Sequence, residues 1–184
     1  MDASLFAVAN IIVQISRDEM NGRSDMNLPQ LFHDEWTNIT KLGAGCDDAC
    51  LTLLKSLLAT VAAHHRLGEP SDTGLKLVLH PSVERLSDVG ETLHTDSGTL
   101  TLLFHNECSI QAFLPNAKLW AFTPPLEGCV LVNVGDSLQK LSGGKFHSPQ
   151  HRVTQPFDGA MTRFYLSYFL RPEMGLLETW GVTK

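Results

Sequence analysis

After residue 70 the chain is divided into short apolar runs that are broken by glycine, proline, asparagine and aspartate. The runs read LKLVLH, GTLTLLF, SIQAFLP, KLWAFTPP, GCVLVNVGD, HRVTQP and TRFYLSYFLRP. Runs of this length, rich in β-branched and aromatic residues, are typical of strands. Several short strands in series predict a sandwich or barrel, so we expect a mainly β fold.

Residues 1–68 show a different pattern and are predicted to be helical. The opening MDASLFAVANIIVQISR begins with an acidic residue rather than a basic one, so it does not resemble a signal peptide. Its apolar residues recur at helical spacing, namely Leu5, Val8, Ala9, Ile12 and Ile15. We therefore predict an amphipathic helix here.

A second helix is predicted after the glycines of LGAGCDDAC, with Asp47 or Asp48 as its N-cap and Gly68 after its end. Its apolar stripe consists of Leu51, Leu54, Leu57, Leu58 and Val61. His64 and His65 are expected at a solvated helix end, where the macrodipole favours them. We expect residues 1–68 to pack on a barrel formed by 69–184, giving one domain of ordinary size.

Charge and cysteine content exclude several classes of protein. The 184 residues carry a formal net charge of −6 and contain no basic run, which argues against nucleic acid and anionic membranes as partners. No apolar run is long enough to span a bilayer. The cysteines Cys46, Cys50, Cys108 and Cys129 fit reduced thiols in a cytoplasmic protein. Cys46 and Cys50 lack a matching pair for a metal site, so we interpret them as small helix residues.

Two ionisable residues, His94 and Asp96, stand at the start of the run LHTDSGTLTLLF. Residues i and i+2 of a strand point to the same face, so an imidazole nitrogen and a carboxylate oxygen would lie side by side. Such a pair suits a divalent metal, and a simple hydrogen-bonded pair is the alternative. KFHSPQHRVTQP offers His147 and His151 as a third ligand. Two histidines and one carboxylate leave the opposite positions of the metal open, as in non-haem Fe(II) oxygenases.

Three segments, HTDSGTLTLL, GCVLVNVGDSLQKLSGGKFHSPQHRV and RFYLSYFLRP, carry a resemblance to a known family. They resemble the signature segments of the Fe(II)- and 2-oxoglutarate-dependent dioxygenases, and most closely the isopenicillin N synthase-like branch with its fungal tailoring enzymes. The resemblance covers about residues 75–172. It implies a double-stranded β-helix, which is a jelly-roll barrel like that of the cupins, and oxidation of a small molecule in secondary metabolism by hydroxylation, desaturation or cyclisation.

The resemblance also implies a set of site residues. His94 and Asp96 match the first two iron ligands of the family, and His151, which begins the match to H-R-V, is the third; His147 is its local competitor. The cofactors implied are Fe(II), dioxygen and 2-oxoglutarate as co-substrate. Arg163 occupies the position that pairs with the far carboxylate of 2-oxoglutarate, a role that suits a permanently charged planar fork.

Two positions of the co-substrate anchor differ from the family pattern. Tyr165 stands where a serine usually follows the arginine, with Ser167 two residues further on, and His80 stands where many relatives have a tyrosine. The Tyr165 phenol could supply the missing hydroxyl, which would keep 2-oxoglutarate bound. Alternatively, the larger ring could exclude 2-oxoglutarate and leave an iron oxidase or cyclase that works without it.

The chain is also short for this branch, and we expect it to lack the strand-bearing region that usually precedes the helices. An uncovered sheet edge invites pairing. We expect this edge to be covered by residues 1–68 or by a second copy in a homo-oligomer. Alternatively, the chain is a truncated, non-catalytic relative that acts as a binding protein or partner subunit.

The remaining aromatic and histidine residues have two interpretations each. Phe104, Phe113, Trp120 and Phe146 could wall a substrate pocket, although such residues more often belong to the core. His33 and His105 have no evident partner and are expected at the surface.

Overall fold

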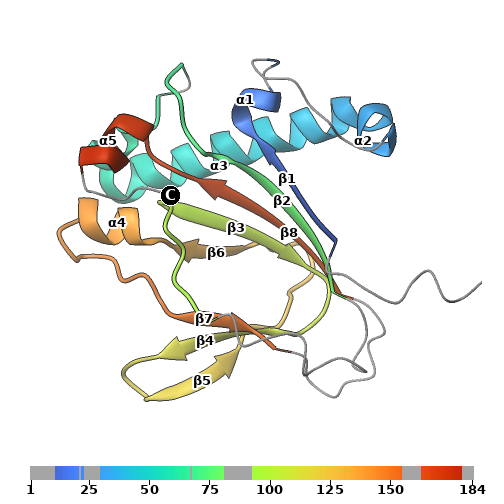
Figure 1. The fold of residues 1–184 in the computed structure, drawn as a ribbon. Helices are drawn as coiled ribbons and strands as arrows, with labels where there is room; N and C mark the ends of the chain where they lie inside the picture. The colour runs from blue at the N-terminus through green and yellow to red at the C-terminus, as the bar shows by residue number, and fades with distance from the viewer. Residues whose placement is uncertain are drawn as a thin grey trace, which may run out of the picture.

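Two antiparallel sheets, one of five strands and one of three, form the centre of the structure (Figure 1). The structure is a computed structural model that describes residues 11–20, 22, 30–66, 68–80, 93–154 and 163–179. The larger sheet has the order β1 (Ile11–Ser16), β2 (Gly74–His80), β8 (Arg163–Leu170), β3 (Leu100–His105) and β6 (Leu131–Val134). The smaller sheet has the order β5 (Leu119–Phe122), β4 (Ile110–Leu114) and β7 (His151–Val153).

This strand order is that of a jelly roll, because the chain passes repeatedly from one sheet to the other. β3, β6 and β8 belong to the larger sheet, whereas β4, β5 and β7 belong to the smaller one. Each of the seven apolar runs forms a strand. The predicted mainly β fold with N-terminal helices, a double-stranded β-helix, is confirmed.

Helices cover the face of the larger sheet that points away from the smaller one (Figure 1). α3 (Trp36–Ala62) runs across this face, with α1 (Arg17–Met20) and α2 (Gln30–Asp34) on the same side and α5 (Met174–Thr179) near the end of α3, whereas α4 (Asp136–Leu141) lies at the end of β6. The hydrophobic core lies between α3 and this face and joins Cys46, Cys50, Leu54, Val61, Leu75, Leu100, Leu102, Leu138, Tyr168 and Leu170. The polar residues Thr101, Arg163 and Ser167 lie on the opposite face of the sheet, toward β7 and β4. None of the described helices is both long and apolar enough to cross a membrane.

The prediction of a helix in the opening segment is wrong for Ile11–Ser16, which forms β1. All six residues of β1 pair with β2, from Ile11 opposite Leu79 to Ser16 opposite Gly74. Ile15 is completely buried. β-Branched residues suit a strand, and pairing with a distant partner outweighed the helical spacing. β1 precedes the helices, so the expected lack of a strand there is wrong, and the edge of β2 is covered by a strand of this chain. Residues 1–10 lie outside the described part. The division into a helical segment and a barrel core stays a prediction.

The predicted start of the second helix is also wrong. α3 begins at Trp36 and continues through the glycines, so Asp47 lies in its middle. A Cβ at Gly43 would lie only 2.5 Å from Sδ of Met20. The lack of a side chain at Gly43 therefore allows Met20 of α1 to pack against α3. Asp47 is buried, and its Oδ1 lies 3.5 Å from Nη1 of Arg17. In the predicted stripe, Leu57 is instead 47% exposed.

Candidate metal centre

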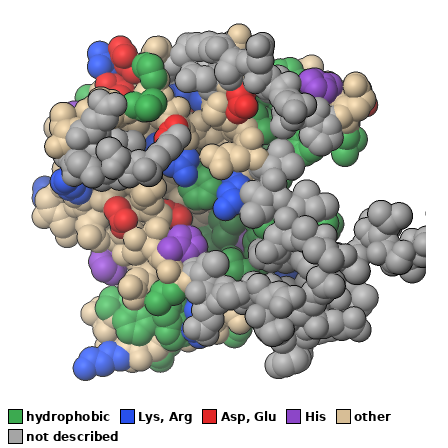
Figure 2. All heavy atoms as spheres, in the orientation of Figure 1, with side chains coloured by type: hydrophobic (Ala, Val, Ile, Leu, Met, Phe, Trp, Pro, Cys, Tyr) green, Lys and Arg blue, Asp and Glu red, His purple; other side chains and the backbone are tan. Residues whose placement is uncertain are grey.

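Two histidines from distant parts of the chain face each other where the smaller sheet continues beyond β7. His94 donates its backbone N–H to His151 O at 3.1 Å, and His151 donates its own to His94 O at 2.9 Å. Directly opposed residues of an antiparallel pair project their side chains to the same side. The two rings accordingly lie with their centroids 4.3 Å apart. Figure 2 shows histidine and basic side chains around a hollow in which hydrophobic side chains are visible.

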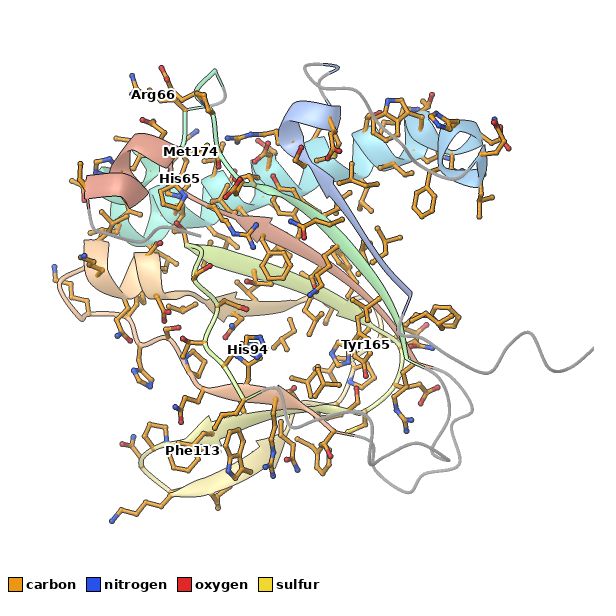
Figure 3. The ribbon with its side chains drawn as sticks, in the orientation of Figure 1. His65, Arg66, His94, Phe113, Tyr165 and Met174 are labelled. Atoms are coloured by element: carbon orange, nitrogen blue, oxygen red, sulfur yellow. The ribbon has the colours of Figure 1, made fainter. Side chains whose placement is uncertain are left out.

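Asp96 completes a group of three. Its Oδ1 lies 3.8 Å from Nε2 of His94 and 3.6 Å from Nε2 of His151. One ligand atom of each residue lies within 4.8 Å of the others. Asp96 is buried, whereas the side chain of His94 is 48% exposed, so the group is open to solvent on one side (Figure 3). The structure brings together the three residues predicted as ligands, and His147 is exposed and outside the group.

The second oxygen of Asp96 is held by two side chains that sequence reasoning missed. Thr101 Oγ1 on β3 donates to Oδ2 at 2.7 Å, and Asn133 Nδ2 on β6 donates to the same atom at 2.6 Å. Thr101 and Asn133 are directly opposite each other in the β3–β6 pair. Oδ1 is consequently the oxygen presented to the imidazoles. The signal in the sequence that could have indicated this support was the polar residue Asn133 within the otherwise apolar strand LVNV.

The loop that carries Asp96 is fixed by the start of α4. Asp136 N donates to Asp96 O at 2.7 Å, and Ser137 N donates to Gly98 O at 3.0 Å. A Cβ at Gly135 would lie 2.1 Å from Gly98 O, so only glycine allows this approach. The segment VGDS therefore fixes the backbone that positions Asp96.

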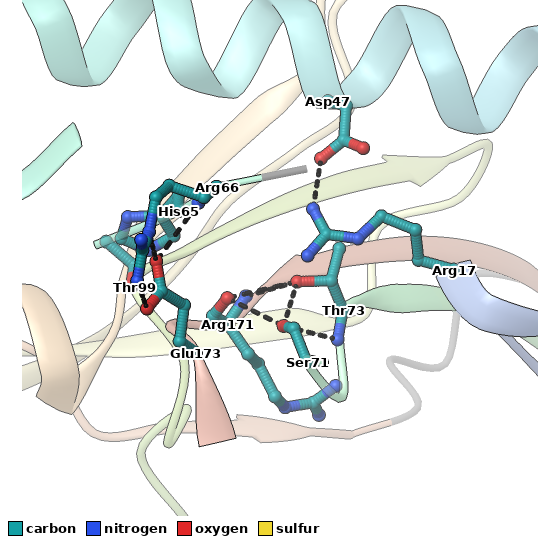
Figure 4. A network of polar contacts seen from close by, with 9 residues as sticks. All are labelled: Arg17, Asp47, His65, Arg66, Ser71, Thr73, Thr99, Arg171 and Glu173. Atoms are coloured by element: carbon teal, nitrogen blue, oxygen red, sulfur yellow. Dashed lines mark hydrogen bonds and ion pairs between the residues drawn. The ribbon is translucent and has the colours of Figure 1, made fainter. Parts of the chain in front are cut away.

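His65 supports the same loop from the other side, which corrects its predicted solvated position. It is 3% exposed, its Nδ1 lies 2.9 Å from Val61 O, and its Nε2 lies 2.7 Å from Thr99 Oγ1 (Figure 4). Because a carbonyl oxygen can only accept, Nδ1 carries the proton and donates to Val61 O, and Nε2 accepts a hydrogen bond from the Thr99 hydroxyl. Burial lowers the pKa of His65 to about 4.

The residues predicted to anchor 2-oxoglutarate lie on β8 and its neighbours. Arg163 is 1% exposed, and strand alternation places Tyr165 and Ser167 on its face of the sheet. The Tyr165 hydroxyl forms a hydrogen bond with the buried Ser109 hydroxyl. His80 lies opposite Arg163 in the β2–β8 register, but its side chain is outside the described part of the structure.

The four aromatic residues do not wall this site. Phe104 and Phe146 pack against the hydrophobic core. Phe113 and Trp120 are paired across β4 and β5, with ring centroids 5.4 Å apart. The Arg152 guanidinium lies 4.5 Å from the Trp120 ring centroid, so this cluster occupies the sheet face opposite to His151. His33 is exposed, as expected, and His105 is half-buried.

A separate apolar cavity of about 530 Å³ lies on the helix side of the larger sheet. It is lined in part by Phe32, Leu77, Leu79, Phe104, Phe164 and Leu166. His94, Asp96 and His151 do not line it. The cavity therefore does not include the three candidate metal ligands, although Tyr165 of β8 also contributes to its lining.

A jelly roll that gathers two imidazoles and one carboxylate has the donor set of a non-haem Fe(II) oxygenase. Comparison with known proteins agrees. Residues 63–172 match the family model described as the 2OG-Fe(II) oxygenase superfamily. The chain belongs to this superfamily, whose members use Fe(II), 2-oxoglutarate and dioxygen.

The chain is similar to several fungal proteins. It is 42% identical over 114 residues to the 2-oxoglutarate-dependent dioxygenase frbH of Dothideomycetidae sp. (strain 11243), covering 60% of this chain and 35% of that protein. It is 32% identical over 170 residues to the 2-oxoglutarate-dependent dioxygenase FG08081 of Gibberella zeae, covering 86% of this chain and 50% of that protein. The chain thus spans half or less of the length of these curated relatives.

Solved structures show the same fold. A full-length Neurospora crassa protein, solved in complex with alpha-KG and 5-formyluracil, superposes with a TM-score of 0.69 at 23% identity, covering 88% of this chain and 57% of that chain. The rice dioxygenase for auxin oxidation superposes with a TM-score of 0.70 at 19% identity, covering 92% of this chain and 61% of that chain. The narrower assignment to the isopenicillin N synthase-like branch stays a prediction.

Proposed function

We propose that this protein is an Fe(II)- and 2-oxoglutarate-dependent dioxygenase that oxidises a small molecule. The observation that carries the proposal is the convergence of His94, Asp96 and His151, with Asp96 Oδ1 less than 4 Å from Nε2 of both histidines. Three protein ligands on one side of the metal leave the other positions for 2-oxoglutarate and dioxygen. When bound, the iron supplies the oxidising power for attack on a C–H bond of the substrate.

The protein residues prepare the ligand atoms before a metal arrives. His151 Nδ1 lies 3.2 Å from Pro149 O, which is the partner expected for a protonated Nδ1. That tautomer leaves the lone pair of Nε2 for the metal. The Thr101 and Asn133 side chains donate hydrogen bonds to Oδ2 of Asp96, so Oδ1 is the oxygen that would bind a metal.

Arg163 is proposed to pair with the far carboxylate of 2-oxoglutarate. A carboxylate inside a barrel must be paired with a charged or hydrogen-bonding partner, and the guanidinium of Arg163 is buried on strand β8. The joined hydroxyls of Tyr165 and Ser109 then take the place of the family's serine. This arrangement favours a modified anchor over the loss of the co-substrate.

The substrate is proposed to be a small molecule of secondary metabolism. The relatives support this class: besides the fungal dioxygenases, they include a wheat gibberellin 3-beta-dioxygenase and a sweet potato feruloyl CoA ortho-hydroxylase.

The cysteines of the chain form no disulfide among the described residues, which fits the proposed cytoplasmic location. β1 is an edge strand of the larger sheet, and a homo-oligomer would form by pairing there; sedimentation analysis would detect it.

The test is an anaerobic titration of the protein with Fe(II) followed by 2-oxoglutarate. A visible charge-transfer band is expected when the oxo acid chelates the iron. Iron binding without the band would instead indicate an oxidase that does not use 2-oxoglutarate. Failure to bind iron would indicate a non-catalytic relative and overturn the proposal.

A further inference from the structure

Two basic residues and a phenylalanine share the face of the larger sheet on which the metal centre lies. Leu75 and Leu77 of β2 pack in the helix-side core, so alternation turns Lys76 to the opposite face. Lys76 lies opposite Ser167 of β8, and Phe169, two residues further along β8, lies opposite Thr101. Thr101 is the residue that holds Asp96 Oδ2. Lys76 and Phe169 are thus neighbours on the surface that faces the candidate iron site.

Arg171 extends this row at the end of β8. Its Cζ lies 4.8 Å from the centroid of the Phe169 ring, and its Nη1 donates to Asp72 O at 2.5 Å. A Cβ at Gly98 would lie 3.3 Å from its Cγ, so the stem of Arg171 rests on the loop two residues after Asp96. Burial lowers the pKa of Arg171, and the carboxylates of Asp72 and Asp96 oppose that effect. The guanidinium therefore lies within electrostatic reach of Asp96.

The ammonium group of Lys76 has no acidic partner in the described ranges, although its side chain is half-buried. A cation withdrawn from water is costly unless an opposite charge compensates it. A ferrous ion, the Asp96 carboxylate, a 2-oxoglutarate dianion and Arg163 would together carry no net charge. Asp72 offsets Arg171 in part. The positive charge that remains on this face is that of Lys76, with a contribution from Arg171.

We propose that the substrate is a small organic acid whose carboxylate binds to Lys76, beside Phe169 and Arg171. The inference rests on the proposed function, because it places the acid next to an iron site loaded with 2-oxoglutarate. Lys76 supplies a point charge with three donors, and Arg171, held by Asp72 O and Phe169, adds a fixed positive charge to the wall. The two residues thus select anionic over neutral molecules of the same shape.

The experiment compares phenylacetate with phenylacetamide, which has nearly the same shape and no charge. Both are titrated calorimetrically into the full chain loaded anaerobically with Fe(II) and 2-oxoglutarate, after the visible band has shown that the oxo acid is bound. We expect phenylacetate to bind about tenfold more tightly than phenylacetamide or better. Lys76→Met should remove that preference, Lys76→Arg should keep it, and Arg171→Met should reduce it.

Lys55→Met is the matched control, because Lys55 is exposed on α3, on the opposite side of the larger sheet. It should leave both affinities unchanged. The inference is overturned if the acid and the amide bind equally, if neither binds saturably, or if Lys76→Met leaves the preference intact while 2-oxoglutarate still binds. If the unmodified protein shows no visible band with Fe(II) and 2-oxoglutarate, the proposed function is overturned as well. The band therefore distinguishes failure of the proposed function from failure of this inference alone.

Discussion

Asn133 donates a hydrogen bond of 2.6 Å to Asp96 Oδ2, the oxygen that does not face His94 and His151. The bond joins β6 to the loop before β3, so the register of the larger sheet sets the orientation of the carboxylate. Hydrogen-bond partners of a ligating carboxylate tune metal affinity without touching the metal.

Replacing Asn133 with alanine should therefore weaken metal binding by about 10- to 100-fold while the fold is retained. Thr101→Val should also lower the affinity for the metal. Thr101→Ser should keep the affinity of the unmodified protein, because serine retains the hydroxyl. Anaerobic titration with Fe(II) or Co(II) gives the affinities. Val132→Ala, on the adjacent and exposed position of β6, is the control. Wild-type affinity in a folded Asn133→Ala variant would show that the bond does not position the ligand.

His94→Ala should abolish metal binding, since only two protein ligands would remain. His147→Ala should bind metal normally, because His147 is exposed and lies outside the group of three. Equilibrium dialysis with Fe(II) under argon measures both variants. Loss of metal binding in His147→Ala would make His147 a ligand, and metal binding retained in His94→Ala would contradict the site.

The strands and the pairing of His94 with Asp96 could be predicted because both are local signals, whereas the third candidate ligand, His151, lies far along the chain and was assigned from the family resemblance. The spacing of His94 and Asp96 fixes their common face, and the turn residues mark the ends of each run. The support around Asp96 could not be predicted in this way. Thr101 and Asn133 meet only through the β3–β6 register, which the sequence of neither strand reveals alone.

The same distinction explains the two wrong helix predictions. The apolar residues of Ile11–Ser16 fit a helix and a strand equally well, and the choice is made by β2, about sixty residues away. Asp47 is a residue type that favours an N-cap. It lies inside α3 instead, because the buried Arg17 of α1 forms an ion pair with it there. Tertiary contacts decided both cases.

Gly135→Ala should lower both stability and metal affinity. The added Cβ would lie 2.1 Å from Gly98 O and 2.9 Å from Asp96 O, so the loop must shift, at a cost of about 1–3 kcal/mol. Gly45→Ala is the matched control: its Cβ meets nothing within 4 Å, and in the middle of α3 it should stabilise by up to about 1 kcal/mol. Urea unfolding measures both changes, and a fully stable Gly135→Ala protein would contradict the tight approach.

Stability should fall as the pH drops from about 6.5 toward 4 because of His65. The folded protein holds the pKa of His65 at about 4, below the 6.5 of a free histidine, so the unfolded chain takes up the proton first. The contribution is complete above pH 6.5 and is lost as the pH falls toward 4, at most about 3 kcal/mol. Urea midpoints measured across this range should fall less steeply for His65→Gln. An equal slope in both proteins would contradict the buried, neutral state of His65.

Tyr165→Phe distinguishes the two interpretations of the altered anchor. The hydroxyl of Tyr165 forms a hydrogen bond with that of Ser109. If this pair binds the far carboxylate, removing the Tyr165 hydroxyl should lower the affinity for 2-oxoglutarate by about tenfold. Ser109→Ala should have a similar effect, since the same pair is broken. Arg163→Met sets the upper end of the scale at about a hundredfold or more, because the buried carboxylate then loses its charged partner.

The opposite interpretation makes a different prediction for the same position. If the ring of Tyr165 excludes the co-substrate, Tyr165→Ser should create 2-oxoglutarate binding that the unmodified protein lacks, because the smaller side chain keeps a hydroxyl and opens space beside Arg163. The visible band of the Fe(II) protein, titrated with 2-oxoglutarate without oxygen, reports all of these variants on one scale. A band in the unmodified protein that Tyr165→Phe weakens supports the modified anchor, whereas a band that only Tyr165→Ser develops contradicts it.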